Sequence, residues 1–228
     1  MKKDNLLRNS IETLFKFLIH DKNLFLKNKE KLIILNELKN IEKINNLKLQ
    51  NSQINLMRVA SDASSSQLLT KFIDEAEKIT NSKIGFYHFY DDTKKMIPSC
   101  TWSTNTLKNM CNAKGDDSHY PIQEAGIWTE CVWEKKPVIH NDYESLSQKK
   151  GLPEGHPPII RELVAPVFRD GKIVGILGVG NKKENYDKND VAAIQELADF
   201  AWEIVRRKQI EELLYESERL LRKIGENY

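Results

Sequence analysis

The sequence predicts an α+β fold in which short strands lie between helices and a long helix follows them. Residues 84–90, IGFYHFY, alternate in the manner of a half-buried strand. Residues 161–182, RELVAPVFRDGKIVGILGVGNK, indicate a strand, an Asp-Gly turn and a second strand, the strongest hairpin signal in the chain. From Asn189-Asp190, an expected N-cap, to about residue 224 there is no Gly or Pro, and apolar residues recur at 3,4 spacing.

The first 66 residues contain neither Gly nor Pro and are rich in Lys, Asn, Leu and Ile, a composition typical of helices. We expect two amphipathic faces with a break at Asp21-Lys22-Asn23. The faces are Ile11, Leu14, Phe15, Leu18 and Ile19 for the first helix, and Ile34, Leu38 and Ile41 for the second. A Ser-rich hinge, SDASSSQ at 61–67, follows and offers N-capping hydroxyl groups.

The middle of the chain predicts short elements joined by turns. An amphipathic helix with Leu68, Phe72, Ile73 and Ala76 on its apolar face precedes the first strand. The remaining expected elements are a strand at 96–102, a helix at 104–112, a strand at 119–122, a helix at 126–134 and a strand at 137–140.

Composition excludes several classes of protein. The net charge of +2 is too small to indicate nucleic-acid or membrane binding, and we interpret the twelve Lys/Arg against six Asp/Glu up to residue 60 as a solvated helix face. There is no run of 18 apolar residues, and Glu12, Lys16 and His20 interrupt the segment that would form a signal peptide. Three cysteines without a CxxC motif predict neither a disulfide framework nor a zinc site. We therefore expect a cytoplasmic protein without a structural metal.

Four segments together resemble one family. TWSTNTLKNMC (101–111), AGIWTECVWEKKPVIHNDY (125–143), KKGLPEGH (149–156) and VAPVFRDGKIVGILGVGNKKENYDKNDV (164–191) are similar to GAF domains of bacterial and archaeal sensor histidine kinases and related signalling proteins. The resemblance covers roughly residues 66–210. It implies a central antiparallel sheet of about six strands flanked by helices, with long N- and C-terminal signalling helices.

The expected organisation has three parts: an N-terminal helical segment (1–66), a GAF domain (67–208) and an extension of the signalling helix (209–228). EELLYESERLLRKIGEN (211–227) resembles the linker that enters a PAS domain, which indicates a fragment whose output domain, a kinase, PAS or other signalling domain, is missing. The sequence has neither a phospho-acceptor His box with ATP boxes nor a GG(D/E)EF motif. We therefore expect no enzyme activity, and a homodimer formed through the flanking helices as a coiled coil.

The resemblance implies a ligand pocket on one face of the sheet, roofed by 103–135 and 140–162. Five aromatic side chains lie in or beside these segments, and a few polar groups accompany them, a combination typical of small-molecule sites. The candidate ligand-binding residues are Trp102, Cys111, Tyr120, Trp128, Asn141, Asp142, Tyr143, His156 and Arg161. The alternative is that the aromatic residues, Trp133 among them, cap a small core and that Asn141-Asp142 is a turn. We interpret the 141–156 stretch, NDYESLSQKKGLPEGH, as the lid of this pocket.

Two candidate residues leave the cofactor open. His156, placed before two prolines, is a metal or haem ligand, a switch that titrates near neutral pH, or a hydrogen-bonding strut for the loop. Cys111 resembles a cysteine of this subfamily, and some related sensors bind haem through a cysteine. Since the chain has no CxxCH motif, the alternative is a buried, inert thiol.

Two other functions stay open. Free methionine-R-sulfoxide reductases are also GAF domains and use three cysteines, so Cys100, Cys111 and Cys131 define an enzymatic alternative. A GAF domain without a ligand, which serves only as a dimerisation spacer, is the other.

Overall fold

The structure, a computed structural model, describes residues 22–109, 120–147 and 157–225 of the chain. Two units can be distinguished, residues 1–47 and 48–228. Helix α2 (Lys22–Ala60) begins within the predicted break and belongs to the first unit up to Leu47 and to the second unit from Lys48 on. Ile34 and Ile41 of the predicted second face are 55% and 51% exposed, so this face of α2 is not buried within its own unit. The expected helix before the break, and the side chain of Leu38, lie outside the described residues.

The second unit contains a five-stranded antiparallel sheet with the strand order β3-β1-β7-β6-β5. Its strands are β1 (Ile84–Phe89), β3 (Cys100–Trp102), β5 (Val138–His140), β6 (Glu162–Arg169) and β7 (Lys172–Gly180). The predicted hairpin is confirmed, since β6 and β7 pair along their length, with one irregularity between Val167 and Phe168, and Asp170 and Gly171 both have positive φ. The predicted antiparallel sheet flanked by helices is therefore present.

The expected strand 96–102 is divided in two. Pro98 has no N–H to donate to a ladder, and it separates β2 (Met96–Ile97) from β3. β2 pairs with β4 (Tyr120–Pro121), which is the predicted strand at 119–122, and the pair forms a second, two-stranded sheet. Because β4 pairs with β2 and does not join the main sheet, the main sheet has five strands instead of about six.

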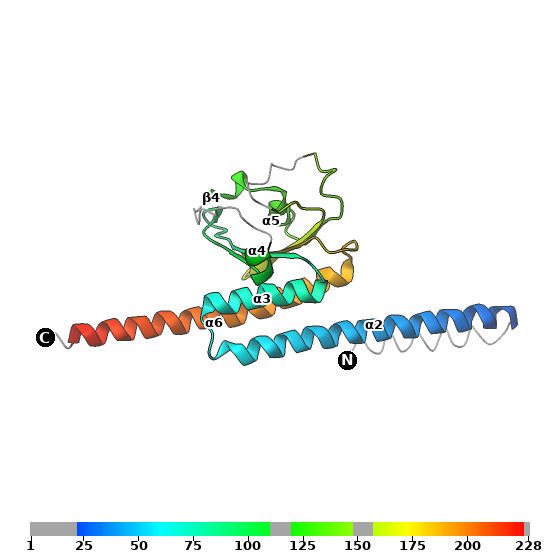
Figure 1. Ribbon diagram of the computed structural model, residues 1–228, viewed down its shortest axis with the longest axis horizontal. Helices are drawn as coiled ribbons and strands as arrows, with labels where there is room; N and C mark the ends of the chain where they lie inside the picture. Colours follow the sequence, from blue (N-terminus) through cyan, green and yellow to red (C-terminus); the bar gives the residue numbers. More distant parts are fainter. Residues whose placement is uncertain (1–21, 110–119, 148–156, 226–228) are drawn as a thin grey trace. The chain divides into compact units, whose positions relative to one another are not determined.

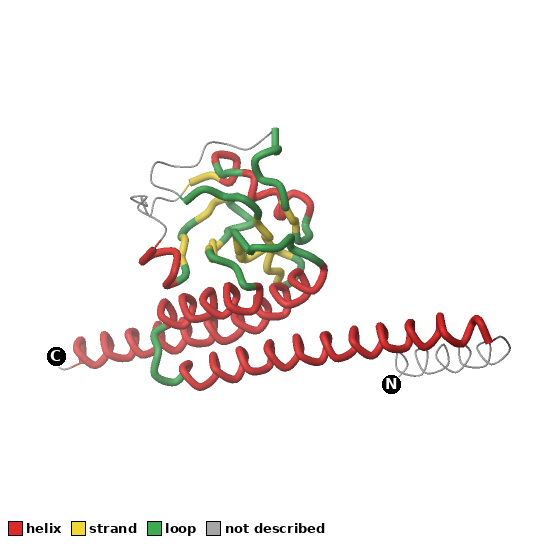
Figure 2. The backbone as a smooth tube through the Cα atoms, turned by 45° about the vertical axis from the view of Figure 1, so that its right-hand side comes forward, coloured by secondary structure: helices red, strands yellow, loops and turns green. Residues whose placement is uncertain are grey.

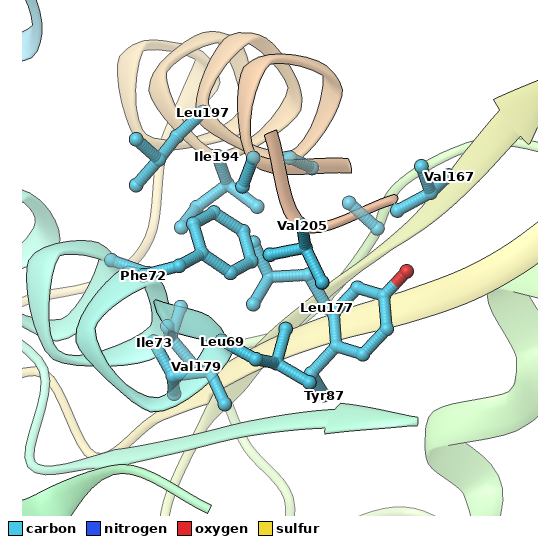
Figure 3. Packing of buried hydrophobic residues seen from close by; sticks show 14 of the residues in the cluster. Leu69, Phe72, Ile73, Tyr87, Val167, Leu177, Val179, Ile194, Leu197 and Val205 are labelled. Atoms are coloured by element: carbon cyan, nitrogen blue, oxygen red, sulfur yellow. The ribbon is translucent and has the colours of Figure 1, made fainter. Parts of the chain in front are cut away.

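Helices α3 (Ser65–Thr80) and α6 (Lys188–Gly225) run side by side along one face of the sheet, as Figures 1 and 2 show. Ser64 caps α3 through a capping box with Gln67, which confirms the hydroxyl cap expected from the Ser-rich hinge. Phe72 and Ile73 of α3 and Ile194 and Leu197 of α6 are fully or almost fully buried in the layer between helices and sheet (Figure 3). This layer is the larger hydrophobic core.

The opposite face of the sheet carries a second core beneath short elements. These are the 3-10 turns η1 (Ile122–Glu124) and η2 (Ile127–Thr129) and helix α5 (Glu130–Glu134), whereas α4 (Thr104–Asn109) lies against α3, where Thr104 donates to Asp74 and Thr106 donates to Glu77. Figure 1 shows β4 and α5 on the side of the sheet away from α3 and α6. Because side chains alternate along a strand, β6 sends Leu163, Ala165 and Val167 toward the helices and Val164 toward this second core.

The start of α6 differs from the prediction by two residues. The expected cap was Asn189-Asp190, whereas the Asp187 carboxylate accepts hydrogen bonds from the backbone N–H groups of Asn189 (2.7 Å) and Asp190 (3.1 Å). Asp190 in turn accepts from the N–H of Asp187 at 3.0 Å, so the two aspartates form a reciprocal cap. Asp190 is buried and paired with Lys182 at 2.7 Å.

Beyond residue 209, α6 has exposed apolar side chains. Their exposed fractions are 52% for Ile210, 61% for Leu213, 60% for Leu214, 60% for Leu220, 65% for Leu221 and 49% for Ile224. Within the described part of the chain, no helix has the length and apolarity needed to cross a membrane.

Candidate functional site

A cleft of about 450 Å³ opens beside the second core, between the short helices and the loop after β5. Its walls come from both segments that the sequence predicted as a roof. The described lining residues are Ile122, Gln123, Ala125, Gly126, Ile127, Thr129, Glu130, Trp133, Leu146 and Ser147. The size is in the range of small-molecule sites, and both expected roof segments contribute residues to this open cleft.

His88 and Trp128 form the inner aromatic cluster of this face. The two rings stack with centroids 4.2 Å apart and an interplanar angle of 10°, and Phe86 packs edge-on against both. Trp102 lies tilted against Phe86 at 5.8 Å. Trp102 and Trp128 therefore belong to the packed second core and are not among the described residues that line the cleft.

His88 is buried, and its side chain is not fully hydrogen-bonded. Its Nδ1 atom has no hydrogen-bond partner, and burial lowers the pKa of the imidazole to about 3. The side chain is therefore neutral at physiological pH. The strand alternation of 84–90 could have placed His88 on the same face as Phe86, but the sequence analysis did not single it out.

The three predicted polar residues at the ends of the loop make hydrogen bonds to backbone groups of the protein. Asn141 accepts from the backbone N–H of Tyr186 at 2.8 Å and donates to the carbonyl of Tyr186 at 3.1 Å. The guanidinium group of Arg161 donates to the carbonyls of Lys182 and Lys183, both at 2.7 Å. Asp142 is exposed and accepts from the N–H of Ser145 at 3.3 Å. Asn141 and Arg161 thus both bind the segment that leads from β7 into α6.

Tyr143 is buried behind the loop. Its N–H donates to the carbonyl of Ile160 at 3.0 Å, which closes the base of the loop. Burial, reinforced by the charge of Glu162, raises the pKa of the Tyr143 hydroxyl to about 12. The predicted Cys111 and His156, and the side chain of Tyr120, lie outside the described residues.

His140 joins the sheet to the wall of the cleft through two carboxylates. Its Nδ1 lies 2.9 Å from Oε1 of Glu162 on β6, and its Nε2 lies 2.8 Å from Oε2 of Glu130 on α5. Burial lowers the pKa of His140, but the hydrogen bonds to Glu162 and Glu130 outweigh this effect and the net pKa is raised. The two carboxylates bind opposite sides of the ring, and the described residues contain no metal-binding cluster.

None of the three residues of this triad was among the predicted site residues. His140 ends the strand PVIH and Glu162 lies in the next strand, so an antiparallel pairing of the two would have suggested their contact. Glu130 carried no such signal, because it reaches His140 from the short helix α5.

The comparisons with known proteins agree with this architecture. A family profile described as "GAF domain" matches residues 62–206. A relative from Methanosarcina acetivorans, called "Methyl sulfide methyltransferase-associated sensor", is 39% identical over 142 residues. These cover 62% of this chain and 14% of the relative, so the chain spans about one seventh of that protein's length.

Two solved structures share the fold at low sequence identity. The GAF domain of a phosphoenolpyruvate-protein phosphotransferase from Coxiella burnetii has a TM-score of 0.57 and 14% identity, covering 73% of this chain and 98% of that one. The free methionine-R-sulfoxide reductase from Neisseria meningitidis has a TM-score of 0.54 and 13% identity, covering 72% of this chain and 91% of that one. Both likenesses concern the fold alone.

Proposed function

Because this chain belongs to the GAF domain family, we propose that it is the sensory module of a cytoplasmic multi-domain signal-transduction protein and has no catalytic activity of its own. A small ligand binds beneath the 141–162 loop, and α6 carries the state of the site to an output domain outside this chain, such as a kinase or a PAS domain. The name of the 39% identical relative, a sensor, supports the sensory part of the proposal.

The observation that carries the relay is the attachment of both loop ends to the segment before α6. Asn141 at one end is bonded in both directions to the backbone of Tyr186. At the other end, Arg161 holds the carbonyls of Lys182 and Lys183. Asn181, which has a left-handed backbone, donates to the carbonyl of Pro158 at 2.8 Å and accepts from the N–H of Ile160 at 2.8 Å. A loop that shifts over a ligand therefore pulls directly on the entry to α6.

A ligand changes the output only if it binds the two arrangements of α6 with different affinity. The first half of α6 is fixed to the sheet through Ile194, Leu197 and Ala201, which are all buried. A displacement at its start is therefore transmitted along a rigid helix to the exposed half beyond residue 209. There, Ile210, Leu213, Leu220 and Ile224 follow heptad spacing, which favours a parallel coiled-coil homodimer.

The reductase alternative receives little support from the thiols. An attacking cysteine needs a depressed pKa and access to substrate, whereas Cys131 is fully buried and its thiol pKa is raised by burial and by the charges of Glu162 and Glu130. Cys100 is partly exposed. The haem alternative rests on Cys111 and His156, outside the described residues.

Three measurements on natively purified protein distinguish these functions. A retained small molecule in native mass spectrometry supports the sensor, a Soret band in the absorbance spectrum supports the haem protein, and turnover of methionine sulfoxide with thiol consumption supports the reductase. A pocket that stays empty and indifferent to ligands leaves the dimerisation spacer.

The relay is tested by hydrogen exchange in Asn141→Ala. Loss of its two hydrogen bonds, each contributing about 1 kcal/mol net, should raise the exchange rate of the first α6 amides, 191–194, roughly tenfold or more. Asp142→Ala is the matched control, because the described bonds of this neighbour stay within its own turn. Equal exchange at 191–194 in both variants and the wild type would refute the coupling of loop and helix.

A further inference from the structure

Glu130 is the one charged side chain among the described residues that line the cleft. The apolar wall consists of Ile122, Ala125, Ile127, Trp133 and Leu146. Trp133 lines the cleft and is 53% exposed, so part of its indole ring is accessible to a ligand. An aromatic face and a carboxylate in one cleft both attract positive charge.

The charge on Glu130 is only partly neutralised. His140 meets a carboxylate at each ring nitrogen, and the protonated imidazole, which the raised pKa of His140 favours, donates to both. One imidazolium between Glu130 and Glu162 leaves the triad with one net negative charge. The nearby ammonium group of Lys136 is bound to Glu134 at 2.7 Å and is 66% exposed, so solvent weakens its effect.

The negative charge of the two glutamates raises the pKa of neighbouring groups. After burial, the charge of Glu162 is the next cause that raises the pKa of the Cys131 thiol and of the Tyr143 hydroxyl. Glu130 contributes to the shift of Cys131 as well. Among the described lining residues, Glu130 is the group whose charge an anionic ligand would meet.

We propose that this cleft binds a small organic cation with an apolar body, whose charge lies between the Glu130 carboxylate and the Trp133 ring. The inference rests on the proposed sensory function and names the ligand class of that site. The apolar part of the ligand packs against Ile122, Ile127 and Leu146. The Glu130 carboxylate that would bind the ligand is also hydrogen-bonded to His140. The ligand therefore changes the contact between α5 and the sheet.

The probes are choline and dimethylbutanol, its neutral isostere in which a carbon atom replaces the ammonium nitrogen. Dimethylbutanoate serves as the anionic counterpart. The indole N–H NMR signal of Trp133, assigned with Trp133→Phe, is followed during titration of each compound to millimolar concentration. We expect choline to bind about tenfold more tightly than dimethylbutanol and the anion to be weakest.

Glu130→Gln should reduce the preference for choline over dimethylbutanol to no more than about threefold, the part supplied by the indole ring. Glu134→Gln is the matched control, since Glu134 lies on the same helix, is exposed and is not among the lining residues. Melting curves of both variants show whether they remain folded. Equal or tighter binding of the neutral or anionic compound, no binding of choline, or an unchanged preference in Glu130→Gln would overturn the proposal.

Hydrogen exchange at 191–194, measured with and without each compound, distinguishes this inference from the proposed function. If choline binds with the expected preference while hydrogen exchange at 191–194 stays constant, the cation site stands and the relay fails. If a neutral or anionic compound binds and alters exchange at 191–194, the relay stands and the cation preference is overturned.

Discussion

Two buried histidines give the stability of this domain opposite dependences on pH. His88 has a pKa of about 3 in the folded protein, against 6.5 ordinarily. Between these values the unfolded chain binds one proton more than the folded protein, so stability falls as the pH falls. For His140 the folded pKa is raised above 6.5. There the folded protein binds the extra proton, so the stability it contributes is present below 6.5 and is lost as the pH rises through the raised pKa.

When the folded and unfolded states differ by one bound proton, the free energy of unfolding changes by about 1.4 kcal/mol per pH unit. Integrated from pH 7, His88 alone lowers the free energy of unfolding at pH 5.5 by about 1.3 kcal/mol. We therefore expect a stability maximum near pH 6.5. His140→Gln should also cost about 3–5 kcal/mol, because it leaves the buried Glu162 carboxylate without its cation.

Urea denaturation at half-unit pH intervals measures these slopes. His88→Phe keeps the ring against Trp128 but cannot titrate, so its stability should not show the His88 slope below pH 6.5, whatever the repacking costs. The free energy of unfolding of His140→Gln should stay constant above pH 6.5, where that of the wild type decreases. Comparison of slopes between variants cancels the contribution of Glu77, whose pKa burial also raises. Parallel curves for His88→Phe and the wild type would refute a neutral, buried His88.

Two further predictions concern the sheet and the dimer. A Cβ atom at Gly178 would lie 2.1 Å from the ring of Phe86, so Gly178→Ala should cost about 1–3 kcal/mol in thermal unfolding. Gly180→Ala in the same strand, where the nearest atoms are 3.5 Å away, is the control that should keep the wild-type melting temperature. Replacing the exposed Leu213 and Leu220 together by Asp should convert a dimer to folded monomers in sedimentation equilibrium, with a cooperative melting curve that no longer depends on protein concentration, and a variant that still dimerises would contradict the coiled coil.

Local patterns were sufficient for most of the fold. The two positive-φ residues of the β6–β7 turn are Asp170 and Gly171, as the Asp-Gly signal predicted. The apolar spacing of α3 placed Phe72 and Ile73 in the core. These features depend on residues within one turn or one strand. The break at Pro98 could also have been foreseen, since proline interrupts a ladder.

The roles of the predicted site residues were decided by tertiary structure. The sequence placed Asn141 and Arg161 on the loop that borders the pocket, but their partners are backbone atoms of Tyr186, Lys182 and Lys183. They support the entry to α6, and a ligand role for them remains a prediction.

The sequence by itself determined the α+β class, the strand–turn–strand signals and the helical faces, because these follow from spacings of two to four residues. Only the tertiary structure placed His140 between Glu130 and Glu162, and Asn141 against Tyr186. The physical reason is that such contacts join polar groups 10 to 45 positions apart. Their geometry is fixed by how the strands pair and how the short helices pack on the sheet, and no periodicity along the chain encodes either.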